Sequence, residues 1–146
     1  MARKVFFSFK YEDVHRAMNV RNSNVISGVL KSGFIDKAEF EKIKQQGDRA
    51  IRSWIDNQLS GTSVTVVLVG ADTDQSKWVK YEIEESIARG NGLITLDISK
   101  VSDLQGNTTD CCSLRVNGYK HYLWNRDNGR ENLGAWVEAA ARAAGN

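Results

Sequence analysis

Two runs of branched, apolar residues limit what this 146-residue chain can fold into more than any other feature does. Residues 63–70 have the sequence Ser-Val-Thr-Val-Val-Leu-Val-Gly, and residues 93–98 have the sequence Leu-Ile-Thr-Leu-Asp-Ile. A strand with one face in water alternates apolar and polar residues, whereas these runs are almost continuously apolar. Such runs are typical of central strands in a parallel sheet that is covered on both faces.

The rest of the chain alternates between strand-like and helical patterns. We predict, in order, a strand at 4–9, a mostly helical stretch at 11–30, a short strand or loop at 33–36, a helix at 48–59, the strand at 63–70, a helix from Thr73 or Asp74 to about residue 89, the strand at 93–98, an irregular segment at 99–120, a strand at 119–124 and a last helix that Gly145 closes. This alternation predicts a single α/β domain over residues 1–146, with a doubly wound, mainly parallel sheet flanked by helices.

Composition narrows the class of protein. Hydrophobic residues make up 41% of the chain and charged residues 26%, which is ordinary for a soluble domain. The formal net charge of +2 is too small to make nucleic acid the expected partner. No apolar run approaches the roughly 20 residues of a membrane span, and residues 1–5 lead directly into a strand rather than a signal peptide. We therefore expect a cytoplasmic protein without membrane contact.

Several common chemistries lack their sequence patterns. The adjacent Cys111 and Cys112 are poorly placed to bridge each other, and with two histidines in the chain they form no zinc pattern, so we expect ordinary thiols and no metal site. No G-x-G-x-x-G or P-loop follows the first strand, and G-x-S-x-G is missing around Ser8. The paired acids of a phospho-accepting receiver domain are also missing from the ends of the predicted strands.

The helix after residue 70 carries the most informative pattern. Val79, Ile83 and Ile87 are four residues apart and predict its core stripe. Trp78 and Glu82 are also four apart and share an adjacent face, near the strand ends where doubly wound sheets bind ligands. An aromatic ring beside a carboxylate suits a ligand with a flat ring and a hydroxylated sugar. The alternative, which spacing alone favours, is a half-buried Trp with a solvated Glu.

Other polar residues are weaker candidates. Alternation along the first strand directs Phe7 and Phe9 to one face and Phe6 and Ser8 to the other. Ser8 is small and close to the predicted crevice, so a ligand contact is reasonable, whereas most of the phenylalanines are expected in the core. Asp36 lies near the end of a predicted element and is a candidate for holding ribose or phosphate, with ordinary surface pairing as the alternative.

Three blocks of the sequence resemble a known family. Residues 3–14 together with 20–22, residues 57–70 and residues 78–83 are similar to the TIR-like domain of the Thoeris anti-phage defence system. The resemblance covers about residues 3–100 and implies a flavodoxin-like TIR fold that uses NAD. Catalytic TIR domains break the nicotinamide–ribose bond with the glutamate of a Trp-x-x-x-Glu helix motif. Here that motif runs from Trp78 to Glu82, so the resemblance assigns the catalytic role to Glu82.

The resemblance also implies a product and partners. It suggests a cyclic ADP-ribose isomer, made after an unknown phage trigger, that diffuses to a separate effector protein. It further suggests activity in a homo-oligomer. On this reading Trp78 or Tyr81 stacks on a base, and Phe6, Ser8 and Asp36 line the pocket.

Two other functions remain open at this point. A non-catalytic TIR-like module would act by protein contact or nucleotide binding, and substitution of Glu82 would leave it unaffected. A nucleoside-processing transferase with a similar fold would also use a catalytic glutamate. Competition between NAD and deoxynucleosides distinguishes this transferase from the NAD-processing enzyme.

Overall fold

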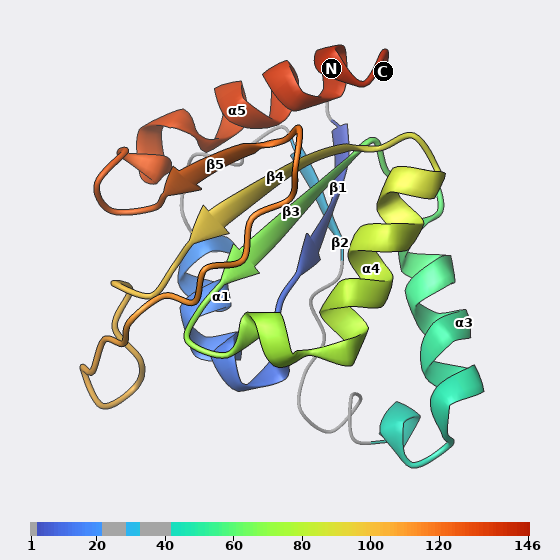
Figure 1. Cartoon of the computed structure of the whole chain (residues 1–146), viewed down its shortest axis with the longest axis horizontal. Coiled ribbons are helices and arrows are strands. Elements are labelled where there is room, and N and C mark those ends of the chain that lie inside the picture. Colours follow the sequence, from blue (N-terminus) through green and yellow to red (C-terminus); the bar gives the residue numbers. More distant parts are fainter. Residues whose placement is uncertain (1–2, 22–28, 33–41) are drawn as a thin grey trace.

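A computed structural model describes residues 3–21, 29–32 and 42–146. Its centre is a sheet of five parallel strands in the order β2-β1-β3-β4-β5 (Figure 1). The strands are β1 (Arg3–Ser8), β2 (Val29–Ser32), β3 (Val64–Val69), β4 (Gly92–Asp97) and β5 (Lys120–Leu123). This is the flavodoxin-like order, in which the direction of winding reverses between β1 and β3. The predicted doubly wound parallel sheet is confirmed.

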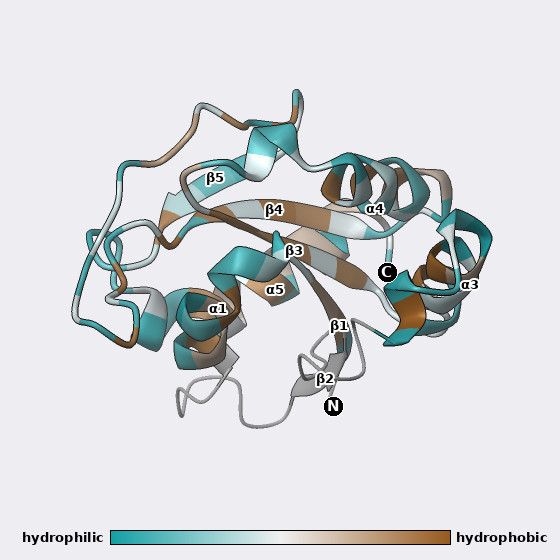
Figure 2. Cartoon of the chain, turned by 90° about the horizontal axis from the view of Figure 1, so that it is seen from below, coloured by the Kyte–Doolittle hydropathy of each residue, from teal (hydrophilic) through white to brown (hydrophobic). Residues whose placement is uncertain are grey.

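Helices cover both faces of the sheet (Figures 1 and 2). On one face lie α1 (Val14–Arg21) and α5 (Gly129–Ala143), and on the other lie α3 (Asp48–Leu59) and α4 (Lys77–Ala88). Phe7 of β1 packs with α1 and α5, whereas Phe6 packs with α3, which confirms the alternation predicted for the first strand. Among the described residues, no helix is long and apolar enough to cross a bilayer.

The connection from β4 to β5 crosses the sheet without a helix. Residues 98–119 are all described and include no helical segment. In place of a helix, the segment 111–116, which we call the strap, lies against β3, β4 and α4. Cys111, Cys112, Leu114 and Val116 pack there on a core cluster that contains Val67 and Val79. The expected irregular segment is thus confirmed, but part of it does the covering that a crossover helix usually does.

The strap fixes the end of β3. The Cys112 amide donates to the Gly70 carbonyl at 3.0 Å, and the Cys111 thiol contacts the Val69 carbonyl at 3.8 Å. Burial raises the pKa of the Cys111 thiol to about 12, so it carries almost no thiolate at neutral pH. Both cysteines are free.

One close approach fixes α5 on the sheet. A Cβ added at Gly92, the first residue of β4, would lie 2.6 Å from the Ala140 carbonyl carbon and still nearer to its oxygen. Glycine is therefore required here by space, because the backbone of α5 occupies the position of a side chain.

Three local predictions are wrong. Val29 and Leu30 belong to β2, not to a helix, because pairing with Arg3 and Lys4 of β1 overrides a weak helical pattern. The short strand or loop considered at 33–36 is not one of the three, because it lies outside the described residues and stays a prediction. The α4 N-cap is Ser76, whose hydroxyl accepts from the Val79 amide, because Thr73 begins a short 3-10 turn instead.

The third correction concerns the core stripe of α4. Ile87 is 41% exposed, whereas Ser86 is fully buried. The Ser86 hydroxyl hydrogen-bonds to Thr65 of β3 at 2.6 Å and donates to the Glu82 carbonyl at 2.7 Å. Thr65 of the sheet thus provides a hydrogen-bond partner for Ser86 in the core. The buried face of α4 therefore includes Ser86, and it also includes Glu82.

Candidate functional site

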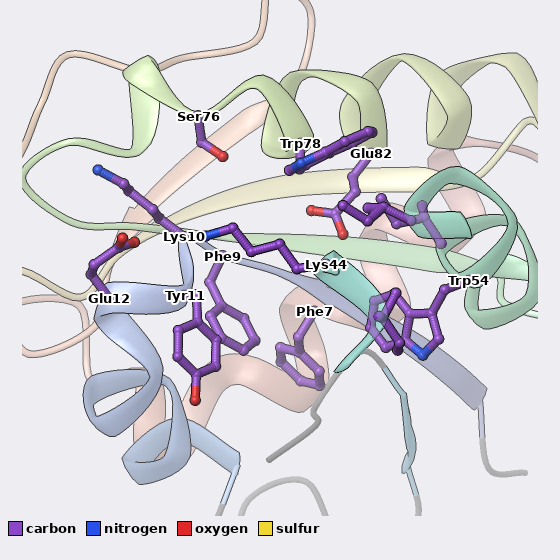
Figure 3. Close-up of a pocket in the computed structure, with 13 residues that line it drawn as sticks. Phe7, Phe9, Lys10, Tyr11, Glu12, Lys44, Trp54, Ser76, Trp78 and Glu82 are labelled. Carbon is purple, nitrogen blue, oxygen red and sulfur yellow. The ribbon is translucent and has the colours of Figure 1, made fainter. Parts of the chain in front are cut away.

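A pocket opens at the carboxyl end of β1, between that strand and helices α3 and α4 (Figure 3). Its cavity volume is about 230 Å³. Trp78 and Glu82 of α4 form one wall, Trp54 of α3 another, and Phe9 and Tyr11 the wall that follows β1. This is the switch point between β1 and β3, where doubly wound sheets bind their ligands.

Glu82 is the buried acid of this pocket. Its residue surface is only 7% exposed, so the solvated glutamate of the simpler alternative is not what the structure contains. The Ser8 hydroxyl at the end of β1 donates to Glu82 Oε1 at 2.7 Å. Burial raises the pKa of the Glu82 carboxyl to about 8, although the hydrogen bond from Ser8 acts in the opposite direction. The carboxyl is therefore mostly protonated at neutral pH in the unliganded protein.

Trp78 lies one helical turn before Glu82. It is half-buried, lines the same pocket and meets the Tyr81 ring edge-on at a centroid distance of 6.0 Å. The aromatic face and the carboxyl thus border one cavity, as their spacing predicts. A flat ring that contacts Trp78 would bring an attached sugar close to Glu82.

A family model supplies the decisive comparison. Residues 6–103 match the model described as "Thoeris protein ThsB, TIR-like domain". The chain belongs to this family. The match covers both halves of the site, Ser8 on β1 and the Trp78–Glu82 motif on α4, and it confirms the resemblance of the sequence.

A curated relative agrees with this assignment. The chain is 41% identical over 110 residues to a Bacillus cereus (strain MSX-D12) protein named "Putative cyclic ADP-D-ribose synthase ThsB1". The aligned region is 73% of this chain and 57% of the relative. The match thus spans a little over half the length of that relative.

The other predicted site residues that the structure describes in this TIR-like domain are not part of the pocket wall. Ser8 is fully buried and reaches the site only through its hydrogen bond to Glu82. Phe6 is fully buried and packs with Ile55 of α3, so it supports the site from within the core. The Tyr81 phenol donates to Asp56 of α3 at 2.9 Å and thereby ties α4 to α3. Asp36 lies outside the described residues. The functional roles given to these residues stay predictions.

Sequence reasoning missed several lining residues. Trp54 belongs to the apolar stripe expected for residues 48–59, and that pattern does not distinguish a core residue from a pocket wall. Lys44 lines the site from residues 42–44, a helical segment that precedes α3, and no pattern in the sequence indicated this. Lys10, in contrast, directly follows the first strand, so its position in the sequence was a usable signal.

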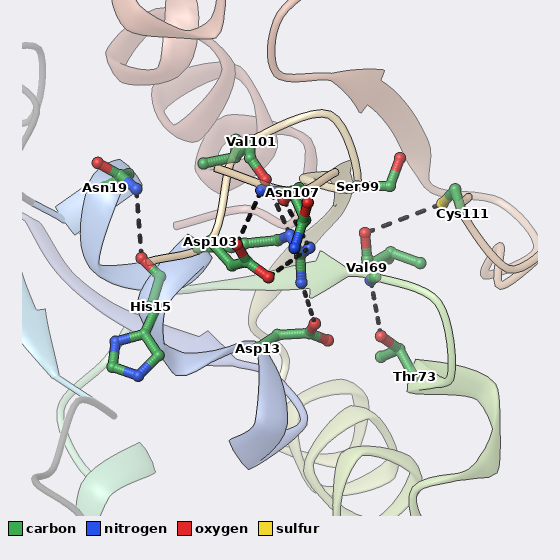
Figure 4. Close-up of polar contacts among 12 residues, drawn as sticks. Asp13, His15, Asn19, Val69, Thr73, Ser99, Val101, Asp103, Asn107 and Cys111 are labelled. Atoms are coloured by element: carbon green, nitrogen blue, oxygen red, sulfur yellow. Dashed lines mark hydrogen bonds and ion pairs between the residues drawn. The ribbon is translucent and has the colours of Figure 1, made fainter. Parts of the chain in front are cut away.

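The other side of the switch point in this TIR-like domain is filled (Figure 4). Asp13 is buried against Gly70. A methyl side chain in place of the hydrogen of Gly70 would collide with the Asp13 carboxylate. Burial raises the pKa of the Asp13 carboxyl, and the Arg16 guanidinium, 3.5 Å from it, acts in the opposite direction. Arg16 also donates to the carbonyls of Val101 at 2.8 Å and Asn107 at 3.1 Å. This cluster joins α1 to the loop after β4 and leaves the pocket on the side of α3 and α4.

The Ser8 contact gives a first testable prediction. Replacement of Ser8 by Ala removes a hydrogen bond that favours the charged carboxylate, so the Glu82 pKa should rise by about one unit. An NMR titration of isotopically labelled glutamate carboxyls measures this shift directly. Ser86→Ala is the matched control, because Ser86 contacts the backbone of Glu82 and not its carboxyl. An unchanged Glu82 titration in the Ser8 variant would show that the contact does not set this pKa.

Proposed function

We propose that this TIR-like domain cleaves the nicotinamide–ribose bond of NAD and closes the resulting ADP-ribosyl cation into a cyclic ADP-ribose isomer. The observation that carries the proposal is the buried Glu82 carboxyl beside Trp78 in a pocket at the switch point. The family match and the name of the Bacillus cereus relative support the same activity.

The chemistry of the first step suits this site. Nicotinamide carries a positive charge in NAD, so the C1′–N bond breaks with both electrons going to a neutral leaving group, and no general acid is needed. Positive charge then develops on the ribose, as in glycoside cleavage. A carboxylate in a water-poor pocket stabilises that charge. The cationic ring of the bound substrate favours ionised Glu82, which offsets the effect of burial on its pKa.

Ring closure requires a second arrangement. After nicotinamide has left, a nucleophilic atom elsewhere in the same ADP-ribosyl cation must be held close to C1′ so that it, and not water, forms the new bond there, which is a problem of positioning. Exclusion of water then decides between the cyclic and the linear product. The aromatic walls made by Trp54, Trp78 and Tyr11 provide apolar surface against which the nucleotide can fold.

The proposed product has a signalling role. A small cyclic nucleotide diffuses, so it can activate a separate effector during phage infection without contact between the two proteins. The match to a Thoeris family supports this place in antiviral defence.

Mass spectrometry of cell extracts tests the proposal. Cells expressing this chain, with and without phage, should show an infection-dependent ion with the mass of cyclic ADP-ribose. Glu82→Gln should abolish the ion, and Glu84→Gln, at an exposed position of the same helix, should keep it. Linear ADP-ribose alone would indicate a hydrolase. Defence without any NAD-derived product would indicate a binding module, and preferential use of deoxynucleosides a transferase.

A further inference from the structure

One short stretch of chain joins the two halves of the switch point. Residues 9–12, which we call the β1 wall, all line the pocket (Figure 3), and the next residue, Asp13, is buried against Gly70 at the end of β3. We propose that Asp13 is a positioning residue, which sets where the β1 wall stands relative to Trp78 and Glu82 and so how the substrate is held. This inference rests on the proposed function, because it concerns the placement of substrate in that same pocket.

The contact between Asp13 and Gly70 leaves no room for adjustment. A Cβ added at Gly70 would lie 2.7 Å from the carboxyl carbon of Asp13, which is closer than Cβ atoms come to any neighbour. The φ angle of Gly70 is not in the left-handed region, so space and not backbone conformation requires glycine here. The Asp13 carboxyl therefore fixes how closely the chain after β1 approaches the end of β3.

Gly70 is itself held in place by its neighbours. Its amide donates to the hydroxyl of Thr73 at 2.8 Å, and its carbonyl accepts from the Cys112 amide of the strap at 3.0 Å. Thr73 is fully buried and begins the 3-10 turn that leads into α4. Asp13 thus packs on the connection that carries the Trp78–Glu82 motif, so it links the β1 wall to the opposite wall of the pocket.

Asp13 is anchored on its other side as well (Figure 4). The Arg16 guanidinium lies 3.5 Å from its carboxylate and also donates to the carbonyls of Val101 and Asn107. The Asp13 amide donates to the Lys10 carbonyl at 2.8 Å, which closes the turn that forms the β1 wall. Asp13 does not line the pocket, so it acts on the substrate only through the β1 wall.

Two measurable quantities report where the β1 wall stands. The β1 wall and Glu82 border the same cavity, and burial is the main cause of the raised Glu82 pKa. If the β1 wall moved outward, water would reach the carboxyl and its pKa would fall towards 4.5. The substrate would also be held less precisely, which raises KM. A change in stability alone would alter neither quantity in the folded protein.

An NMR titration of labelled glutamate carboxyls tests the proposal in the full chain without any turnover. In Asp13→Ala and in Gly70→Ala, the Glu82 pKa should fall by at least about one unit, because the first change removes the anchor and the second displaces it. The two changes together should lower it no further than Asp13→Ala alone. The three atoms nearest to the new methyl group belong to the carboxyl that Asp13→Ala removes.

Three further variants separate shape from charge. Asp13→Asn keeps the shape without the charge, so the Glu82 pKa should stay within about 0.3 units of the wild-type value. Arg16→Gln is a milder change that leaves Asp13 and Gly70 in place. It should lower the Glu82 pKa, although loss of a positive charge by itself would raise it. Arg142→Gln breaks an exposed ion pair of α5 and should change nothing. Thermal unfolding shows which variants are folded.

The kinetics of nicotinamide release supply the second readout. In Asp13→Ala, KM for NAD should rise at least about fivefold, and Asp13→Asn should restore most of the wild-type value. Loss of folded protein would instead lower the apparent kcat and leave KM unchanged.

The results separate the inference from the proposed function. If the wild-type protein cleaves NAD but folded Asp13→Ala and Arg16→Gln proteins keep the wild-type Glu82 pKa and KM, the inference is wrong and the function stands. If the Glu82 pKa shifts as expected but no NAD turnover occurs, the positioning of the β1 wall stands and the function is wrong. Additive shifts in the double variant, or an Asp13→Asn shift as large as that of Asp13→Ala, would also overturn the inference.

Discussion

Glu82→Gln is expected to abolish NAD cleavage, with a loss in kcat/KM of at least about a thousandfold. Glutamine keeps the size of the side chain and can still accept the hydrogen bond that Ser8 donates. It has no negative charge, however, and so it cannot stabilise the positive charge that develops on the ribose. The rate of nicotinamide release measures the effect, with Glu84→Gln as the control. A Glu82 variant that still turns over NAD at the wild-type rate would remove this residue from the mechanism.

The same substitution should make the protein more stable at alkaline pH. The pKa of Glu82 is raised by burial from 4.5 to about 8 in the folded state. The folded protein thus holds this proton more tightly than the unfolded chain does. The resulting contribution to stability is fully present below pH 4.5 and is lost as the pH rises through about 8. Its full size is on the order of 3–5 kcal/mol.

Urea unfolding of the two proteins at about pH 5 and about pH 9 measures this contribution. The wild-type protein should lose free energy of unfolding between the two conditions, and Glu82→Gln should lose less by a few kcal/mol. An identical pH dependence in both proteins would show that Glu82 is ionised in the folded state. Activity and stability thus move in opposite directions at this residue, as expected for a buried acid kept for function.

The second large effect is structural. Gly92→Ala should destabilise the fold by about 3 kcal/mol, because the new methyl group would occupy the position of the Ala140 carbonyl. A carbonyl inside α5 cannot move alone, so the whole helix would have to withdraw from β4. Denaturant unfolding measures the loss.

Two controls identify the cause of that loss. Gly90→Ala replaces a nearby glycine at φ +79 that has no neighbour within 4 Å of an added Cβ. It should cost only the strain of the left-handed conformation, about 1 kcal/mol. Ala140→Gly should not rescue Gly92→Ala, since the obstacle is a backbone atom. A Gly92 variant as stable as the Gly90 variant, or rescue by Ala140→Gly, would contradict this explanation.

Much of the fold could be predicted because the decisive patterns are local. The uninterrupted apolar runs of β3 and β4 identify the centre of the sheet, and the alternation of elements gives its parallel winding. Two of the three errors occur where a distant partner decides. Val29 pairs with Arg3 of β1, and Ser86 is buried because it hydrogen-bonds to Thr65 of β3. In both cases the partner is more than 20 residues away in the sequence.

The candidate site, like the fold, has a part that local spacing predicts and a part that depends on how distant segments pack. Trp78 and Glu82 share a pocket wall because four residues make about one helical turn, and this spacing is visible in the sequence. The burial of Glu82 and its contact with Ser8 depend on how α4 packs on β1. Trp54 reaches the pocket through the packing of α3 beside α4, and Lys44 reaches it from residues 42–44 before α3. No pattern within either segment specifies these positions. Sequence reasoning therefore identified the candidate catalytic residue and missed much of its surroundings.

The helix-free crossover has a consequence for how this domain can vary. The strap lies on one side of α4, and α3 and the pocket lie on the other (Figure 2). Leu104 projects into solvent, 74% exposed, from a tight turn closed by the Asp103 amide bonded to the Asn107 carbonyl at 2.9 Å. Extra chain inserted at this turn would lengthen a surface loop and leave the pairing of β4 with β5 intact. This turn is accordingly a position where additional residues can be inserted, in evolution or by design, without changing the residues that form the pocket.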